Sequence, residues 1–197
     1  GLFRRKRIRA RFTAGALIAE QRLERLEVRS YQTEFVGALF HADFHSGSRQ
    51  VLTRDGSWVT PELLAILDDR SRLCCHGQWY LAESAENSTH GLVQGLLKRG
   101  LPRAVMTDNG SAFIAGEFEQ GLRELGIVHE LTLPYSAYQN AKQEVFWVPI
   151  ETRLLAMLEG VEELTLQLLN DATQAWIELE YNRSVHSEIG TSPLECF

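Results

Sequence analysis

The order of strand-like and helix-like segments is the feature that most limits the fold of this chain. Four apolar runs with strand character come first, at residues 35–44, 47–53, 58–69 and 72–82. Helical segments then alternate with short strands, the helices near 84–99, 115–125, 141–159 and 164–181, the strands at 103–107 and 127–131. An antiparallel meander followed by such alternation predicts a mixed α/β sheet flanked by helices.

Several local signals support this order of elements. Asp55-Gly56, between apolar flanks, predicts a hairpin turn. Ser84 and Gly100 have the residue types expected at the two ends of the helix between them. Adjacent residues of a strand point to opposite faces, so Cys74 and Cys75 form a poor disulfide or zinc pair. Nothing in the cysteine content indicates an oxidising compartment, and we expect an intracellular protein.

The length of 197 residues fits one domain with a sizeable core and a possible appendage. The apolar share of 44% and the charged share of 23% are those of an ordinary globular protein. No apolar run approaches the roughly 18 residues that a membrane-spanning helix needs. A membrane protein is therefore not expected.

Charge is unevenly distributed along the chain, although the formal net charge is only −6. Residues 1–11 contain no acid and six basic residues: Arg4, Arg5, Lys6, Arg7, Arg9 and Arg11. The other 186 residues carry 14 basic and 26 acidic side chains. Such an arm can bind a nucleic acid despite an acidic body, or it can be a solvated tail. Residues 14–35 predict a polar connecting helix.

Three carboxylates have unusual positions in this pattern. Asp43 lies inside the first strand-like run, Asp108 ends the strand at 103–107, and Glu144 lies in the first turn of the helix that begins near Asn140. Each has an ordinary interpretation: a paired structural acid, a turn residue and an acid favoured by the helix dipole. Together, two acids on neighbouring strands and one on a helix across the sheet could bind divalent metal. Paired Mg²⁺ ions in such sites support phosphoryl transfer on nucleic acids.

The same residues lie in blocks that resemble a known family. "HADF", "TDNGSAF" and "YSAYQNAKQEVFW" are similar, in order, to the catalytic blocks of DDE transposases and retroviral-type integrases. Between Asp108 and Glu144 there are 35 residues, the spacing of the D,D-35-E signature. "LLAILDDRSRL", "KRGLPRAVMTDNG" and "WIELEYNRSVHSEIGTSPLE" extend the match over about residues 35–197. The chain most resembles bacterial insertion-sequence transposases.

The resemblance implies an α/β, ribonuclease H-like fold with a five-stranded mixed sheet flanked by helices. It implies two units, a basic arm and linker helix over residues 1–34 and an integrase-type catalytic core over 35–197. Asp43, Asp108 and Glu144 would be catalytic residues and ligands of Mg²⁺ or Mn²⁺, with two ions expected. The implied activity is cleavage of DNA at element ends and joining of the 3′-hydroxyl to target DNA. A homo-oligomer in the bacterial cytoplasm, associated with the nucleoid, is the expected setting.

The resemblance also suggests which residues contact DNA. Asn109 follows the second carboxylate, and Lys142 precedes Glu144 by two positions. Tyr135, Gln139 and Asn140 lie in the loop that corresponds to the flexible active-site loop of the family. Phosphate contacts from such residues would orient the nucleic acid, and Arg4, Arg5, Lys6 and Arg7 of the arm could add to them. Solvent exposure or turn formation is the ordinary alternative for each.

Other candidates have weaker support. Asp68 and Asp69 look suitable for catalysis in isolation, but their position at a strand end beside Ser71 favours structural hydrogen bonds. His41 and His45 each lie two residues from Asp43, so a strand would place both side chains on the same face as Asp43.

Two positions depart from the family pattern. Ala141 replaces the usual glycine, and Pro149 falls within the glutamate helix, where it predicts a kink or an early end. These changes leave open a catalytically decayed or domesticated DNA-binding protein of the same fold. A plain metal-dependent nuclease is a third alternative.

Overall fold

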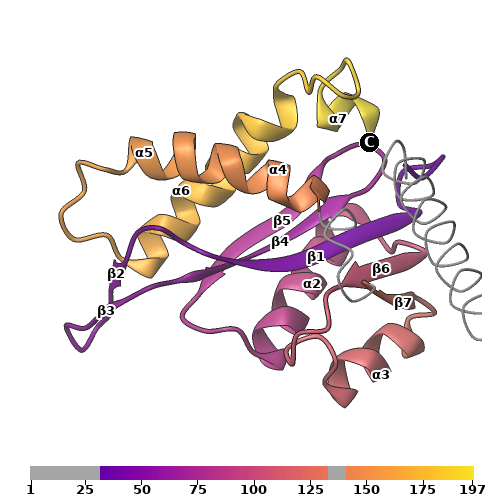
Figure 1. The fold of residues 1–197 in the computed structure, drawn as a ribbon, viewed down its shortest axis with the longest axis horizontal. Coiled ribbons are helices and arrows are strands. Elements are labelled where there is room, and N and C mark those ends of the chain that lie inside the picture. Colours follow the sequence, from indigo (N-terminus) through magenta and orange to yellow (C-terminus); the bar gives the residue numbers. More distant parts are fainter. Residues whose placement is uncertain (1–31, 133–140) are drawn as a thin grey trace, which may run out of the picture. The chain divides into compact units, whose positions relative to one another are not determined.

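The computed structural model describes residues 32–132 and 141–197, and Thr33–Phe197 forms one compact unit. Its main sheet has five strands in the order β5-β4-β1-β6-β7 (Figure 1). The strands are β1 (Leu39–Ser46), β4 (Glu62–Asp68), β5 (Cys74–Tyr80), β6 (Ala104–Thr107) and β7 (Val128–Leu131). β4 is antiparallel to both β1 and β5, whereas β6 is parallel to both β1 and β7. The predicted five-stranded mixed sheet with flanking helices is therefore confirmed.

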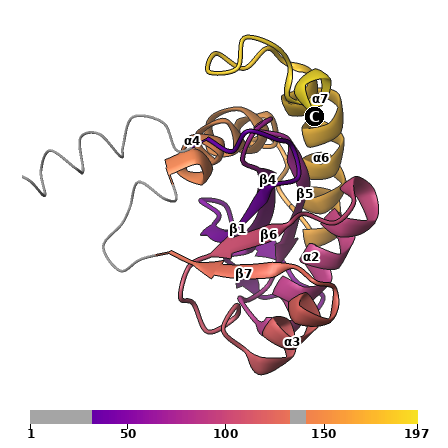
Figure 2. The same ribbon diagram turned by 90° about the vertical axis from the view of Figure 1, so that its right-hand side faces the viewer.

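Helices cover both faces of this sheet (Figure 2). On one face lie α2 (Ala85–Arg99) and α3 (Gly116–Glu124). On the other lie α4 (Ala141–Pro149), the π-helix η2 (Ile150–Leu154), α5 (Leu155–Met157) and α6 (Leu166–Leu179). A short 3₁₀ turn, η3 (Tyr181–Arg183), and α7 (Pro193–Cys196) complete the described chain.

The central strands are buried on both faces, which explains their nearly continuous apolar runs. In β4, Leu63, Ala65 and Leu67 pack towards α4 and α6, whereas Leu64 and Ile66 pack towards α2 and α3. Cys74 belongs to the first of these cores and Cys75 to the second, so the two thiols point to opposite faces as predicted. Both cysteines are buried, and neither forms a disulfide.

The ends of the first long helix follow from its sequence. The Ser84 hydroxyl oxygen accepts a hydrogen bond from the Asn87 amide at 3.1 Å, which satisfies one of the unpaired amides at the start of α2. At the other end Gly100 has a φ of +87°, a backbone conformation that side chains disfavour. The predicted cap residues are both confirmed.

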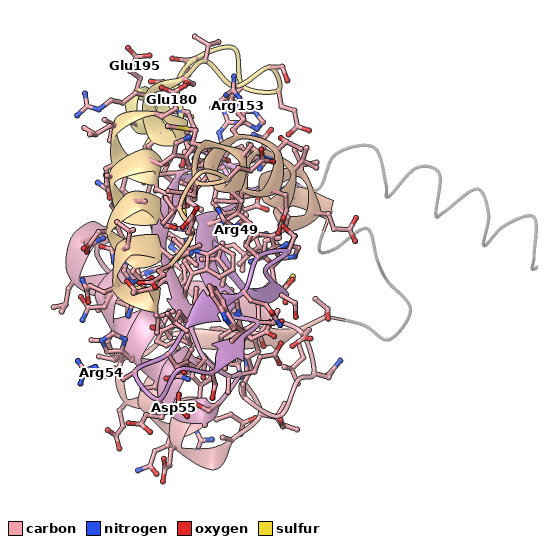
Figure 3. The ribbon with its side chains drawn as sticks, turned by 90° about the vertical axis from the view of Figure 1, so that its left-hand side faces the viewer. Arg49, Arg54, Asp55, Arg153, Glu180 and Glu195 are labelled. Atoms are coloured by element: carbon pink, nitrogen blue, oxygen red, sulfur yellow. The ribbon has the colours of Figure 1, made fainter. Side chains whose placement is uncertain are left out.

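The run at 47–53 does not join the main sheet, and this part of the strand prediction is wrong. Its only strand is β2 (Val51–Leu52), which pairs with β3 (Trp58–Val59) in a separate two-stranded sheet. The predicted turn between them is present, with Gly56 at a φ of +85°. In Figure 3, Arg54 and Asp55 lie at the turn of this hairpin and Arg49 lies between it and the helices.

Polar contacts explain why this segment leaves the sheet. The Arg49 guanidinium donates to the carbonyls of Leu158 and, at 2.8 Å, Val161. The Leu52 amide donates to the Leu164 carbonyl at 2.8 Å. The hairpin is thus tied to the connection between α5 and α6, and not to the main sheet.

The glutamate helix changes its hydrogen bonding at the predicted position. α4 ends at Pro149 and continues as the π-helix, in which the Leu155 amide donates to the Ile150 carbonyl. Proline has no amide hydrogen to donate to the carbonyl four residues earlier, so the regular helix is interrupted at that point. The predicted interruption near Pro149 is confirmed.

The amino-terminal expectations fall mostly outside the described residues. The basic arm and residues 14–31 of the expected linker helix are among the residues left undescribed. Residues 32–35 are not helical, which corrects the predicted end of that helix. There the Thr33 amide donates to the Asp69 carboxylate at 2.7 Å, a contact that draws the chain towards the end of β4.

Within the described residues, no helix combines the length and apolar character required to cross a membrane.

Candidate active site

Asp43 lies on β1, an interior strand of the sheet, and its side chain is half-buried. Ala42 belongs to the core beneath α2 and α3, and Phe44 packs against that core. Because successive side chains of a strand alternate between its faces, Asp43 lies on the opposite face, which α4 covers. The Phe44 amide donates to Asp43 Oδ1 at 3.0 Å. A carboxylate in the middle of an apolar sheet is thereby presented to one side of the molecule.

The parallel register of β1 and β6 brings the second acid beside the first. Each of the three paired β1 residues, Leu39, Phe40 and His41, faces the β6 residue 65 positions further along the chain. Continued two residues beyond the last pair, this offset would bring Asp108, one residue after the end of β6, level with Asp43. The two carboxylates are close enough for the charge of Asp108 to raise the pKa of Asp43.

The turn after β6 fixes the Asp108 side chain. The Gly110 amide donates to Asp108 Oδ1 at 2.8 Å. A β-carbon at Gly110 would lie only 2.8 Å from that same oxygen, so any other residue there would push the Asp108 carboxylate away from this position. Asn109 Nδ2 donates to the Thr132 carbonyl at 3.0 Å and ties the turn to the end of β7. The turn thus holds the carboxylate in place.

Glu144 lies in the first turn of α4 and is exposed. The helix itself is anchored by its other residues: Phe146 and Trp147 are buried in the core, and Gln143 Nε2 donates to the Ala65 carbonyl at 3.3 Å. Ala65 is the β4 residue paired with Asp43. The anchored side of α4 therefore crosses the sheet next to Asp43 and leaves Glu144 free of core contacts.

The electrostatics of Asp43 show that negative charge accumulates at this place. The pKa of Asp43 is raised from 3.8 to about 7, and burial is the largest cause. The charges of Asp108, Glu83 and Glu144 contribute to this rise, which the hydrogen bond from the Phe44 amide only partly opposes. Within the described ranges, none of these four acids forms an ion pair. Asp43 therefore favours a proton or a cation close to its carboxylate.

The donor set fits a hard divalent cation, although it is not assembled into a finished site. Carboxylate oxygens without a counter-charge are the ligands that Mg²⁺ and Mn²⁺ prefer. In the described part of the chain, however, no three histidine, cysteine or acidic side chains stand close enough together to hold a metal ion. Asp108 and Glu144 both interact with Asp43 through their charges.

Glu83 is an acidic neighbour that sequence reasoning missed. It lies between β5 and α2, and burial together with the charges of Glu62 and Asp108 raises its pKa. Its position just before the helix cap Ser84 was the only available signal, and that position is also typical of a simple helix-start acid. The antiparallel return of β5 brings it to the acidic end of the sheet.

Lys142 binds a protein carboxylate in this structure. Its ammonium forms an ion pair with Asp69 Oδ1, which also accepts a hydrogen bond from His41 Nε2 at 2.8 Å. Burial alone would raise the pKa of Asp69, but the hydrogen bonds from His41 and Lys142 outweigh it and hold that pKa well below its usual range. The structural role predicted for Asp69 is confirmed.

Asp68 also has the structural role that its position predicts. It accepts hydrogen bonds from the Gly37 amide at 2.8 Å, and from the Ser71 amide and hydroxyl at 2.8 and 2.7 Å. All three donors lie near the end of β4, and none belongs to α4.

His45 shares the face of Asp43 but is engaged elsewhere. Its Nε2 lies 2.8 Å from Glu151 Oε1, and its ring stacks on Trp147 with the ring centroids 5.0 Å apart. His41 on the same face is buried against Asp69. The sequence spacing predicts that His41 and His45 share the face of Asp43, and these contacts are consistent with that prediction. Both imidazole rings are bound to protein partners.

The remaining residues expected to contact DNA lie outside the described ranges: Tyr135, Gln139, Asn140, Arg4, Arg5, Lys6 and Arg7.

Comparison with solved structures gives several similar folds. The catalytic core of the HTLV-2 integrase in complex with magnesium, in its dimeric form, has a TM-score of 0.66 at 17% identity. That match covers 83% of this chain and 97% of the viral one. The BIV integrase core has a TM-score of 0.62 at 19% identity, covering 81% and 92%.

A longer protein also matches. A chain of the simian T-cell lymphotropic virus intasome, solved in complex with the PP2A subunit B56 gamma, has a TM-score of 0.70 at 16% identity over 84% of this chain. The chain described here spans only 55% of that viral chain. No family model matches the sequence, and the search of curated proteins finds no match either. The described fold is nevertheless the ribonuclease H-like fold of retroviral integrase catalytic cores.

Proposed function

We propose that this chain is a metal-dependent DNA transposase or integrase catalytic domain, with Asp43, Asp108 and Glu144 as its catalytic carboxylates. The observation that carries the proposal is the proximity of Asp43 on β1 to Asp108 just after the neighbouring strand β6, where the charge of Asp108 contributes to the strongly raised pKa of Asp43. Structural carboxylates of this chain, such as Asp69, are saturated by donors, whereas these acids lack a counter-charge. The fold shared with integrase cores supports the same conclusion.

Asp43, Asp108 and Glu144 would hold Mg²⁺ or Mn²⁺, two ions in all. When bound, such ions activate the attacking oxygen and stabilise the leaving oxygen of a phosphodiester. The chain's own contribution is to orient the carboxylates: the Gly110 amide fixes Asp108, and the Phe44 amide binds Asp43. Hydrolysis at an element end would release a 3′-hydroxyl, which would attack target DNA at the same site. No protein nucleophile is required.

Partners follow from this activity. The DNA would comprise the element ends and a target, and joining two ends favours a homo-oligomer. Asn109 and Lys142, with the loop residues Tyr135, Gln139 and Asn140 and the arginines of the arm, would contact phosphates. A bacterial insertion sequence is the element type that the sequence blocks favour, and the chain would then work at the nucleoid in the cytoplasm.

The decisive experiment measures strand cleavage and strand transfer on supercoiled plasmid DNA with Mn²⁺ or Mg²⁺. Asp108→Asn keeps the size of the side chain and removes its charge, and we expect activity to fall about 1,000-fold or more. Asp171→Asn is the matched control, because this exposed acid on α6 contacts only Gln167 on its own helix. Equal activity in wild type and Asp108→Asn would sink the catalytic assignment.

A second candidate is a DNA-binding protein of this fold that no longer cleaves. It is favoured by the finding that no group of three potential ligands in the described ranges is arranged for a metal ion. Such a protein would bind DNA with the same affinity whether or not divalent metal is present, and without producing nicks. Metal-dependent nicking that Asp108→Asn abolishes would exclude it.

A further inference from the structure

One buried carboxylate connects the two elements that carry Asp43 and Glu144. Asp69 has no exposed side-chain surface. Its Oδ1 accepts from His41 Nε2 at 2.8 Å and from the Lys142 ammonium. Its Oδ2 accepts from the Thr33 amide at 2.7 Å and from the Thr33 hydroxyl at 3.1 Å. Both oxygens therefore have two donors, which come from β1, α4 and the chain before β1.

The positions of these donors matter more than their number. His41 precedes Asp43 by two residues on β1, and Lys142 precedes Glu144 by two residues on α4. Each donor is therefore within one helical turn or one strand repeat of a proposed metal ligand. The preceding residue, Asp68, is equally buried, but among the described residues its carboxylate accepts from Gly37 and Ser71, neither of which lies on α4.

We infer that Asp69 is a positioning residue, which sets the first turn of α4, and hence Glu144, against β1 through its ion pair with Lys142 and its hydrogen bond from His41. This inference rests on the proposed function, because Glu144 needs positioning only if it acts with Asp43. It assigns Lys142 a first task inside the protein. Gln143, Phe146 and Trp147 anchor the rest of α4, and among the contacts between described residues that of Asp69 with Lys142 lies nearest the start of the helix.

The physical argument is one of local stability. The first four amides of a helix have no partner within the helix, so its first turn opens easily. A buried ion pair at the second residue of α4 opposes that opening, and removing one partner leaves an uncompensated charge. A metal ligand on an unanchored first turn would be dispersed over several positions, which weakens metal binding.

Hydrogen exchange of the metal-free protein tests this inference directly. Asp69→Asn should accelerate amide exchange of residues 145–148, whose amides bond to the carbonyls of the first turn, about tenfold or more relative to wild type. Asp68→Asn is the matched control: it removes a buried charge from the adjacent residue and should not selectively accelerate α4. Lys142→Met removes the other partner from a side chain that is 18% exposed, so it decides the question even if Asp69→Asn does not fold.

A second measurement concerns metal and DNA separately. For Asp69→Asn and Lys142→Met, the Mn²⁺ concentration for half-maximal nicking should rise about 10-fold or more. The double variant should equal the more impaired single variant, because the two side chains act as one unit. If Lys142 serves only to contact phosphate, Lys142→Met weakens DNA binding and leaves α4 exchange unchanged.

The two failures can be told apart. Unchanged exchange over 145–148 in both variants overturns the positioning inference and leaves the proposed function standing. Accelerated exchange in a protein whose wild type never nicks DNA refutes the proposed function, while the anchoring of α4 by Asp69 stands.

Discussion

Two pairs of buried or half-buried aspartates face very different surroundings. Asp68 and Asp69 at the end of β4 have donors on every carboxylate oxygen, including a lysine and a histidine at Asp69. Asp43 and Asp108 lie on adjacent strands, and each accepts a single backbone amide. The pKa of Asp69 is therefore well below its usual range, whereas that of Asp43 rises to about 7.

The difference separates a structural acid from a candidate catalytic one. Burial is the largest influence on both pKa values, so burial alone does not distinguish them. The supply of donors does. Where the protein itself satisfies a carboxylate, no ligand is needed, and where it does not, a cation from solution can be the missing partner.

The largest expected effect is a difference in folding stability between Asp→Asn substitutions at Asp69 and at Asp43. Asp69→Asn leaves the Lys142 ammonium without its counter-charge and should lower the free energy of unfolding by about 3 kcal/mol. Asp43→Asn removes a carboxylate without a counter-charge and should cost nothing, or stabilise the protein. Urea unfolding at pH 8 without divalent metal measures both. A comparable loss in Asp43→Asn would show that its carboxylate is paired after all.

The second effect is a pH dependence that belongs to Asp43. Its pKa is raised from 3.8 to about 7 in the folded state, so between these values the folded protein holds a proton that the unfolded chain has released. Its contribution to stability is therefore complete below about pH 4 and is lost as the pH rises towards 7, by about 2 kcal/mol for this half-buried group. In Asp43→Asn, the free energy of unfolding should therefore decrease by about 2 kcal/mol less than in wild type between pH 5 and 8. If variant and wild type decline in parallel, the raised pKa is refuted.

The smallest effect tests how closely the turn constrains Asp108. Gly110→Ala puts a β-carbon 2.8 Å from Asp108 Oδ1, and the carboxylate can rotate away, so the free energy of unfolding should fall by about 1 kcal/mol or less. The half-saturating Mn²⁺ concentration should nevertheless rise severalfold, because the carboxylate moves. Gly116→Ala, which meets no atom within 4 Å, is the control. An unchanged metal requirement in Gly110→Ala would show that Asp108 need not be held by this turn.

Much of the fold could be predicted because its signals are local. Ser84, Gly100 and Asp55-Gly56 determine helix ends and a turn through their own backbone preferences, and each is found where expected. The run at 47–53 was misassigned because its partner, the carbonyl of Leu164, lies more than one hundred residues away. A strand pattern shows that a segment is extended, but it does not show which segment it pairs with.

The same distinction applies to the candidate site. Asp43, Asp108 and Glu144 could be selected from their positions in blocks of sequence, and the register of β1 and β6 is consistent with the first two lying together. The partner of Lys142 could not be predicted, because Asp69 lies 73 residues earlier in the chain, just after β4. Glu83 was missed for the same reason: its effect on Asp43 depends on how β5 returns. The sequence patterns identify candidate groups, and tertiary contacts determine which of them remain unsatisfied.

The π-helix after Pro149 has a consequence for how this chain can vary. A π turn accommodates one residue more than an α-helical turn, so it can absorb a single-residue insertion while the helix on either side keeps its face. Here it lies between α4, which carries Glu144, and α5, which buries Leu155. The number of residues between these two helices can thus change by one without rotating either of them.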